Sequence, residues 1–473
     1  MDSCIFSKDD LVLTGNGKIT IIGNYKDAIA SKDNLQIDDG KYEISSMDDG
    51  IRGKDSLVIT GGEFNITSES DAIKSTNDTD ENLGSILITG GSFYLISGSD
   101  GISSINDLKI TGGTFNITSG KGYENVSQNK GMDNFRNFKL YENAQIETDE
   151  ISKKAIKSEN NIIIRDGIFY LNSADDAIHS NNYIGITNGE FEIYAGDDGL
   201  HADSKIIIDD GDIDIKTSYE GIEAENIVIN KGTINIQSED DGMNVCGGMD
   251  NFNMYRGPQI SNSNLNNENS NSLQINGGNI YVNAAGDGLD ANGNIYVNGG
   301  TTVVNGPTNS GNGSLDYDRE FKITSGIFIA SGSSGMAQNA SETSTQNTIM
   351  INFEETIKTG EVISILDEDG NEIVTYSAKK DYDNIVISTK ELENDKKYSI
   401  YTSGESDCGN NNGIYEIGGY TNGELYTEVT LENIITNIGK YGMQNNMMPN
   451  MENNMMKPDK NNLEVWDNNE CRV

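Results

Sequence analysis

Five segments repeat one pattern: NSADDAIHS (172–180), YAGDDGLHAD (194–203), TSYEGIEAE (217–225), QSEDDGMNV (237–245) and NAAGDGLDAN (283–292). In each segment an acidic residue and a small residue precede an aliphatic residue. The spacing of the acids is 22, 22 and 21 residues for Asp176, Asp198, Glu220 and Asp241. A fixed period of this size predicts a solenoid, in which each repeat forms one coil stacked on the previous coil. The acids of successive coils should therefore lie above one another.

Such stacked acids indicate either a bound cation or the chemistry of turns. Coils that are ~4.8 Å apart would place neighbouring carboxylates where they repel by roughly 3–4 kcal/mol at an effective dielectric constant of 20. Ca²⁺ would remove this cost, because it binds about six to eight oxygen ligands in irregular geometry. Asp-Gly pairs also form turns without any metal. Paired acids such as Asp175–Asp176 and Asp240–Asp241 exceed what a turn needs, and they favour Ca²⁺.

Residues 11–330 show strict alternation of apolar and polar residues between glycine turns, which indicates β-strands. We predict roughly 13 coils of about 22 residues. The side chains that lie two residues after the turn glycines should stack inside the solenoid: Phe64, Phe93, Phe115, Phe169, Phe191, Ile213, Ile234 and Ile280. The residues that follow them should face outward: Asn65, Tyr94, Asn116, Tyr170, Glu192, Asp214, Asn235 and Tyr281.

Charge and composition exclude several classes of protein. The chain has 33 Lys and Arg against 75 Asp and Glu, a formal charge of −42, so it lacks the basic surface that nucleic-acid binding needs. No stretch is long and apolar enough for membrane insertion. The first ten residues do not follow the plan of a signal peptide. The cysteines form no metal-binding or redox spacing and define no compartment: Cys4, Cys246, Cys408 and Cys471.

The same patterns predict how the chain is divided. We expect an N-terminal lead-in (1–10), the solenoid (11–330), a flexible linker (331–346) and a small C-terminal antiparallel β cap (347–435). Hairpin-like alternation predicts the cap, because a solenoid needs its last coil covered. The Asn/Met-rich tail (436–473) should be disordered.

Several motifs together resemble one protein family: SYEGIEA, DDAIHS, DDGLHAD, GDGLDANGNIYVNGGTTVVNGP, NGSLDYD and SGSSGMAQ. They resemble the bacterial carbohydrate-binding domain-containing proteins, over roughly residues 10–430 and most specifically between residues 175 and 336. The resemblance implies an all-β, right-handed parallel β-helix, similar in fold to calcium-dependent pectate lyases, which binds cellulose and acidic sugars and holds Ca²⁺. The positions that match the acidic motifs are Asp175, Asp176, Asp197, Asp198, Asp203, Tyr219, Glu220, Glu223, Asp240, Asp241, Asp287, Asp290 and Asp316.

A second column should run two residues after the small residue of each acidic turn: Arg52, Lys74, Ser103, Lys157, His179, His201, Glu223, Asn244, Asp290 and Asp316. Its later members could help to close a cation shell. The stacked histidines are more readily explained by packing or by a hydrogen bond to Asp than by catalysis. A lyase would need a cation and a base. Lys74 and Arg52 are the candidates for the base.

These observations predict a non-catalytic, calcium-binding protein that recognises plant-type polysaccharide, either cellulose or acidic pectic sugars. Tyr94, Tyr170 and Tyr281 are the candidate sugar-stacking residues. A calcium-dependent pectate lyase and a calcium-stiffened structural rod are the alternatives. We expect a monomer whose partner is a polysaccharide, located outside the cell or at its surface.

Overall fold

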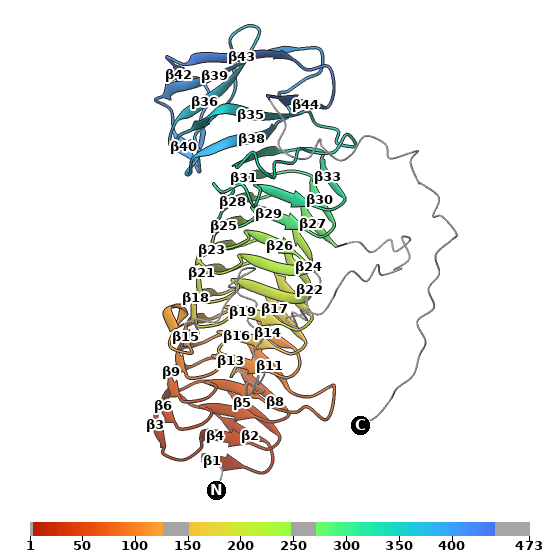
Figure 1. Ribbon diagram of the computed structural model, residues 1–473. Helices are drawn as coiled ribbons and strands as arrows, with labels where there is room; N and C mark the ends of the chain where they lie inside the picture. The colour runs from red at the N-terminus through yellow and green to blue at the C-terminus, as the bar shows by residue number, and fades with distance from the viewer. Residues whose placement is uncertain (1–2, 126–150, 247–270, 440–473) are drawn as a thin grey trace, which may run out of the picture.

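The computed structural model describes residues 3–125, 151–246 and 271–439. These residues form an all-β structure, a parallel stacked solenoid of about 13 turns followed by an antiparallel part. Figure 1 shows a long rod with β1 at one end and the antiparallel strands at the other. One short 3₁₀ helix, η1 (Tyr123–Asn125), interrupts the strands. No helix in the described part of the chain is long and apolar enough to span a membrane.

Each coil contributes one strand to each of three faces. The short-strand face follows the acidic turns and contains β1 (Ser3–Ser7), β4 (Asp27–Ser31), β7 (Ile51–Gly53), β10 (Ile73–Ser75), β13 (Ile102–Ser104), β16 (Ile156–Ser158), β19 (Ile178–Ser180), β22 (Leu200–Ile208), β24 (Ile222–Ile229), β26 (Met243–Val245), β29 (Leu289–Ala291) and β32 (Leu315–Tyr317).

The intermediate face comes next in each coil. It contains β2 (Leu11–Leu13), β5 (Asn34–Ile37), β8 (Ser56–Ile59), β11 (Ser85–Ile88), β14 (Leu108–Ile110), β17 (Asn161–Ile164), β20 (Tyr183–Ile186), β27 (Ser272–Ile275), β30 (Asn294–Val297) and β33 (Glu320–Ile323). The long strands β22 and β24 run through both faces and join them into one 22-stranded sheet.

The long-strand face is the third face of each coil. It contains β3 (Lys18–Gly23), β6 (Lys41–Ser46), β9 (Glu63–Ser68), β12 (Ser92–Ser97), β15 (Thr114–Ser119), β18 (Ile168–Ser173), β21 (Glu190–Ala195), β23 (Asp212–Thr217), β25 (Thr233–Ser238), β28 (Asn279–Ala284), β31 (Thr301–Asn305) and β34 (Ile327–Gly332). All twelve strands pair in parallel with their neighbours.

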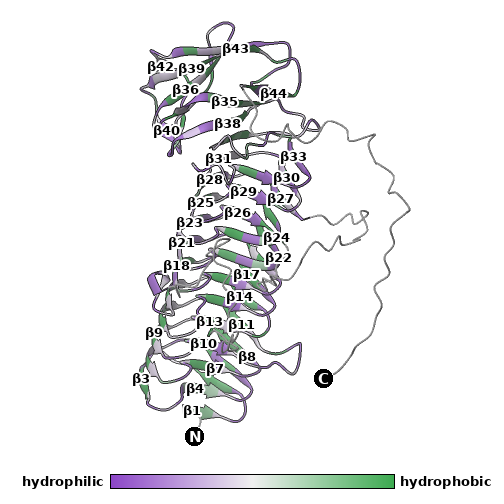
Figure 2. Ribbon diagram, in the orientation of Figure 1, coloured by the Kyte–Doolittle hydropathy of each residue, from purple (hydrophilic) through white to green (hydrophobic). Residues whose placement is uncertain are grey.

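The core of the solenoid is the predicted ladder of stacked side chains. Neighbouring rings from Phe64 to Phe191 have centroids 4.6–4.8 Å apart and are nearly parallel. Ile213, Ile234 and Ile280 continue the ladder at 0–2 % exposure. A positive φ of 127° at Gly113 suits glycine, and a Cβ there would lie 3.0 Å from the ring of Phe115. Figure 2 shows the resulting apolar segments along the strands.

The C-terminal part covers the last coil. Strands β38 (Tyr382–Ser388), β35 (Thr348–Ile357) and β44 (Ile435–Ile438) extend the long-strand sheet, and β38 pairs antiparallel with β34. The other strands form a separate antiparallel sheet: β36 (Val362–Asp367), β37 (Glu372–Tyr376), β39 (Lys397–Ser406), β40 (Asn410–Asn411), β41 (Ile414–Tyr415), β42 (Tyr420–Thr421) and β43 (Glu424–Thr430). A second apolar cluster lies between them and the outer side of β31 and β34.

Three expectations about segments need correction. The parallel ladder begins at β1, within the expected lead-in, because β1 pairs with β4. The expected flexible linker is ordered at its end, where the hydroxyls of Ser341 and Ser344 accept hydrogen bonds from the N–H groups of Phe321 and Ile323. Without these bonds the N–H groups would lie unpaired at the edge of the sheet. The first residues of the expected tail form β44, and residues 440–473 lie outside the described part.

The register can be tested at two adjacent residues of β12. Phe93 is 2 % exposed and Tyr94 is 50 % exposed. Phe93→Ala should lower the free energy of unfolding by about 3–5 kcal/mol because it leaves a cavity, whereas Tyr94→Ala should change it by less than about 1 kcal/mol. Denaturant titration of both variants measures this. Equal losses would contradict the inward and outward assignment.

Candidate functional site

The turns before the short strands carry a stack of acidic side chains, which we call the acidic column. Its members are Asp27, Asp49, Asp71, Asp100, Asp176, Asp198, Glu220, Asp241 and Asp287. In most coils one carboxylate oxygen accepts a hydrogen bond from the backbone N–H of the corresponding residue in the next coil. Asp198 N donates to Asp176 Oδ1 over 3.0 Å, and Asp287 N donates to Asp241 Oδ1 over 2.6 Å. The acids therefore satisfy turn N–H groups that would otherwise be buried without a partner.

The second column stacks in the predicted order. Strand pairing aligns Arg52 with Lys74, His179 with His201, and His201 with Glu223, and it continues through Asn244, Asp290 and Asp316. Each member lies two residues after the small residue of the turn. Where the member is Arg52, Lys74 or a histidine, its side chain contacts the second carboxylate oxygen of an acid in the acidic column.

In the N-terminal coils this second column supplies cations. Arg52 donates to Asp27 Oδ2 through Nε over 2.9 Å, and Lys74 Nζ lies 2.6 Å from Asp71 Oδ2. Burial alone would lower the pKa of Lys74, but the charge of Asp71 raises it above its usual value. Both candidate lyase bases are therefore held as cations in ion pairs. A lysine in this state is a poor base.

Lys154 is a further cation, and sequence reasoning missed it. It replaces an acid in the acidic column, and its Nζ lies 2.5 Å from Asp176 Oδ2 and 3.2 Å from Asp175 Oδ1. Burial would raise the pKa of Asp176, but Lys154 and His179 hold it well below its usual range. The separation of 22 residues from Asp176 was the available signal, which the preceding insertion obscured.

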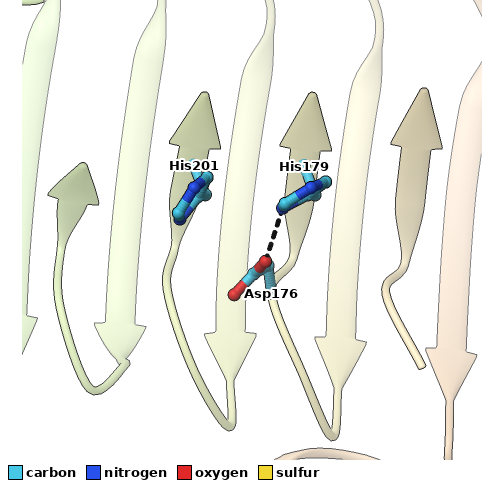
Figure 3. Close-up of side chains that lie close together, drawn as sticks. All are labelled: Asp176, His179 and His201. Atoms are coloured by element: carbon cyan, nitrogen blue, oxygen red, sulfur yellow. Dashed lines mark hydrogen bonds and ion pairs between the residues drawn. The ribbon is translucent and has the colours of Figure 1, made fainter. Parts of the chain in front are cut away.

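The two histidines stack on each other and bond to the acids three residues before them, as expected. Their ring centroids are 4.8 Å apart, and His179 Nδ1 lies 2.8 Å from Asp176 Oδ2 (Figure 3). His201 Nδ1 lies 2.9 Å from Asp198 Oδ2 and 3.2 Å from Glu223 Oε2. Burial would lower the pKa of His201, but these two carboxylates raise it to about 12.

From Glu220 onward neither column contains Lys, Arg or His among the described residues. The pKa values of the acids in this stretch are raised, because burial and the neighbouring carboxylates both disfavour ionisation. Burial and then Glu223 raise the pKa of Glu220 to about 9. Burial and then Asp240 raise that of Asp241 to about 8. Burial with Asp287 and Asp316 raises that of Asp290 to about 7.

Acids of successive coils influence one another's pKa values in this cation-free stretch, which we call the acidic cluster (Glu220, Asp240, Asp241, Asp287, Asp290 and Asp316). A Cβ added to Gly286 would lie 2.2 Å from Asp240 Oδ1 and 2.5 Å from Asp241 Oδ1, so both oxygens face the bare glycine. Asn244 is 8 % exposed, and its Oδ1 has no hydrogen-bond partner among the residues that the structure describes. Its amide donates to Glu220 Oε2 over 2.9 Å. The set is the all-oxygen type that Ca²⁺ prefers.

Several of the predicted metal ligands contact groups outside the acidic cluster. Asp175, Asp176 and Asp197 place one carboxylate oxygen each within 4.8 Å of one another, although Lys154 already binds two of them. Asp203 Oδ1 lies 3.5 Å from His201 Nε2. Asp316 Oδ1 accepts a hydrogen bond from Gln338 over 3.2 Å.

The outward row of the long-strand face also has the predicted register. Tyr94, Asn116 and Tyr170 stand on successive strands, followed by Glu192 and Asp214. A hollow of about 360 Å³ lies over this row and is lined by Asn116, Tyr170, Glu192 and Asp214 among others. It shares its edge at Ile168, Glu190 and Asp212 with a second hollow of about 540 Å³ over the glycine turns.

The three predicted sugar-stacking tyrosines have different surroundings. Tyr94 is 50 % exposed, and the ring of Tyr170 lies 5.7 Å from that of Tyr194, which sequence reasoning did not select. Tyr281 packs against the apolar cluster of the C-terminal part, and burial raises its pKa to about 12. Tyr281 is therefore a packing residue, because the antiparallel strands cover that end of the face.

Comparison with known proteins gives one match. Residues 1–199 match the family model of carbohydrate-binding domain-containing proteins, which confirms the family resemblance over this span and supports a carbohydrate-binding role. The matched span contains Tyr94 and Tyr170, whereas the acidic cluster lies beyond it. No curated protein and no solved structure matches the chain significantly.

The raised pKa values predict how stability depends on pH without metal. Asp241 and Asp290 titrate at about 8 and about 7 in the folded chain but near 4 when unfolded. Between the unfolded and the folded pKa values the folded state binds more protons than the unfolded state, so the stability of the fold decreases as pH rises. The raised pKa of His201 acts in the same direction.

We therefore expect the melting temperature of metal-stripped protein to fall steadily from pH 5 to about pH 8, as measured by circular dichroism. An Asp241→Asn, Asp290→Asn double variant should show a shallower slope. A melting temperature that rises over this range would contradict the electrostatic account.

Proposed function

We propose that this protein is a non-catalytic polysaccharide-binding protein whose acidic cluster binds Ca²⁺. The observation that carries the proposal is the outward row of Tyr94, Asn116 and Tyr170 beside an open hollow, within the span that matches the carbohydrate-binding family. Tyrosine rings stack on the apolar faces of sugars, and amide and carboxylate groups bond to hydroxyl groups. A flat row of such groups suits an extended chain of sugars.

The charge of this face decides between glycans. Glu190, Glu192, Asp212 and Asp214 line the hollow, so a polyanion such as polygalacturonate would be repelled unless cations bridge it to the protein. A neutral glycan such as cellulose needs no bridge. We infer that neutral chains bind directly and that pectic chains bind only when Ca²⁺ is present.

The proposed role of Ca²⁺ rests on the acidic cluster. The oxygens of Asp240 and Asp241 face Gly286, and the buried Asn244 Oδ1 has no partner in the described part of the chain. A bound Ca²⁺ would offset both the burial and the mutual repulsion that raise the pKa values of these acids. It would therefore stabilise the stacked turns, as a ligand that binds only the folded state does.

The two alternative functions fit less well. A lyase would need a neutral base, whereas Lys74 and Arg52 are cations paired with Asp71 and Asp27. A purely structural rod would share the acidic column and the core, but it gives no role to the exposed Tyr94 or to the half-buried Tyr170 beside a hollow. We also propose that the protein acts outside the cell or at its surface, where polysaccharides of this kind occur.

Ca²⁺ should raise the melting temperature of the metal-stripped protein. At a hundredfold excess over the dissociation constant the stabilisation should be about 2.7 kcal/mol, and Mg²⁺ should give less because it needs near-octahedral geometry. Asp241→Asn combined with Asp290→Asn should abolish the Ca²⁺-dependent shift.

Asp71→Asn is the matched control for this experiment. Asp71 stands in the same column but has Lys74 as its cation, so its variant should start from a lower melting temperature and keep the full Ca²⁺-dependent shift. Loss of the shift in Asp71→Asn, or its survival in the double variant, would place the ion elsewhere.

Tyr94→Ala and Tyr170→Ala should each weaken retention on cellulose by about tenfold, since a stacked ring contributes on the order of 1–2 kcal/mol. Affinity electrophoresis and pull-down measure this with and without EDTA. Tyr25→Ala is the control, because Tyr25 is 79 % exposed but lies outside the long-strand face.

The retention pattern also separates the alternatives. Binding of polygalacturonate should vanish in EDTA, whereas binding of cellulose should persist. Release of unsaturated uronate products would establish the lyase instead. Absence of retention on every glycan with Ca²⁺ present would leave the structural rod.

A further inference from the structure

The two stacked histidines of the short-strand face have different neighbours. Asp176, the partner of His179, also binds Lys154 Nζ at 2.5 Å. His179 Nε2 lies 2.9 Å from Asn181 Oδ1. Both nitrogens of this ring therefore have protein partners, and a protein cation already lies on its acid. Figure 3 shows His179 pointing toward Asp176, with His201 in the adjacent coil.

His201 lies between two carboxylates for which no Lys or Arg pair is found among the described residues. Its Nδ1 is 2.9 Å from Asp198 Oδ2 and 3.2 Å from Glu223 Oε2, and one ligand atom from each of the three residues lies within 4.8 Å of the others. The side chains of Asp198 and His201 are 8 % and 3 % exposed, and that of Glu223 is 15 % exposed. The group is thus closed on the inside and reachable from the side of Glu223.

Two further groups lie beside the trio of Asp198, His201 and Glu223. Cys246 follows β26 in the next coil, and its Sγ lies 2.5 Å from Glu223 Oε1. On the opposite side of the imidazole ring, Asp203 Oδ1 lies 3.5 Å from Nε2. A carboxylate that faces the second nitrogen of a histidine is the usual outer partner of a metal-binding imidazole, because it fixes the ring and its tautomer.

We propose that Asp198, His201 and Glu223, with Cys246 as the fourth donor, form a binding site for a divalent transition-metal ion of the Zn²⁺ type. One imidazole nitrogen, two carboxylate oxygens and one thiolate are ligands that Zn²⁺ accepts in tetrahedral geometry. Ca²⁺ is not expected there, since it prefers oxygen ligands alone. This site is separate from the acidic cluster and does not depend on the proposed glycan binding.

Metal binding at this site replaces hydrogen bonds with coordinate bonds. The ion takes the place of the proton on His201 Nδ1 and of the thiol proton of Cys246, and both protons pass to the solvent. Zn²⁺ needs ligand distances of about 2.0–2.3 Å, so the side chains must draw together around the ion. Glu223 and Cys246, which are the less buried members, have room for this movement.

The test uses the full chain, stripped of metal and then saturated with Ca²⁺ so that the all-oxygen sites are filled. Titration with Zn²⁺ by calorimetry should show one tight site with release of protons. Co²⁺ should give the intense visible absorption of tetrahedral coordination and a sulfur-to-cobalt charge-transfer band. His201→Gln and Glu223→Gln should each weaken Zn²⁺ binding at least tenfold, and Cys246→Ser should remove the charge-transfer band.

His179→Gln is the matched control, because it removes the same ring from the adjacent coil, where Lys154 already serves as the cation. This variant should bind Zn²⁺ as the unmodified chain does. Circular dichroism checks the fold of each variant. Should His201→Gln not fold, the more accessible Glu223→Gln and Cys246→Ser decide the matter.

Three results would overturn the proposal. They are the absence of a tight Zn²⁺ site in the unmodified chain, equal losses in His179→Gln and Glu223→Gln, and a weak Co²⁺ spectrum typical of octahedral water ligands. None of these results bears on Ca²⁺ or glycan binding, which are measured separately.

Discussion

The rest of the structure depends on the hydrogen bond that most turns donate to a carboxylate of the neighbouring coil. A solenoid that turns sharply once per coil buries backbone N–H groups at the turn, and each of these groups needs an acceptor. Asp71, Asp176 and Asp241 accept such N–H groups from the next coil. This repeated hydrogen bond helps to fix the register of the coils. It also places the acidic side chains of successive coils directly above one another.

The stacked charges require compensation, and the protein achieves it differently along the rod. In the N-terminal coils the compensation is internal, since Arg52, Lys74 and Lys154 each bind column carboxylates. Beyond His201 the described columns hold no basic side chain. The carboxylates that accept these hydrogen bonds are therefore neutralised by basic side chains in the N-terminal coils. In the later coils the corresponding carboxylates remain as an excess of oxygen ligands. We attribute the proposed Ca²⁺ site to this change in composition.

The outward row of the long-strand face, where we propose that glycans bind, also depends on the register of the coils. Because the coils are held in register, the outward residues of β12, β15 and β18 align, and Tyr94, Asn116 and Tyr170 form a row. The inner neighbours of these residues form the stacked phenylalanine ladder. A row of rings and amides at regular spacing is a surface that an extended polymer can follow.

Much of this arrangement could be predicted from sequence, because residues that are separated by one repeat period stack above one another in a solenoid. The ladder from Phe64 to Phe191 and the alignment of His179, His201 and Glu223 follow from spacing alone. Lys154 was missed because an insertion precedes its coil, and the role of Tyr281 was misjudged because contacts with the C-terminal strands have no period. The unpartnered oxygen of Asn244 depends on side-chain rotation, which the sequence does not encode.

The most direct test of this account is an anomalous difference map from crystals grown with Ca²⁺ and measured at long wavelength. The account predicts a peak at the acidic cluster, bound by oxygens that include those of Asp240 and Asp241, and no peak between Asp71 and Lys74. A map without a peak at Asp241, or with its main peak in the N-terminal coils, would contradict it.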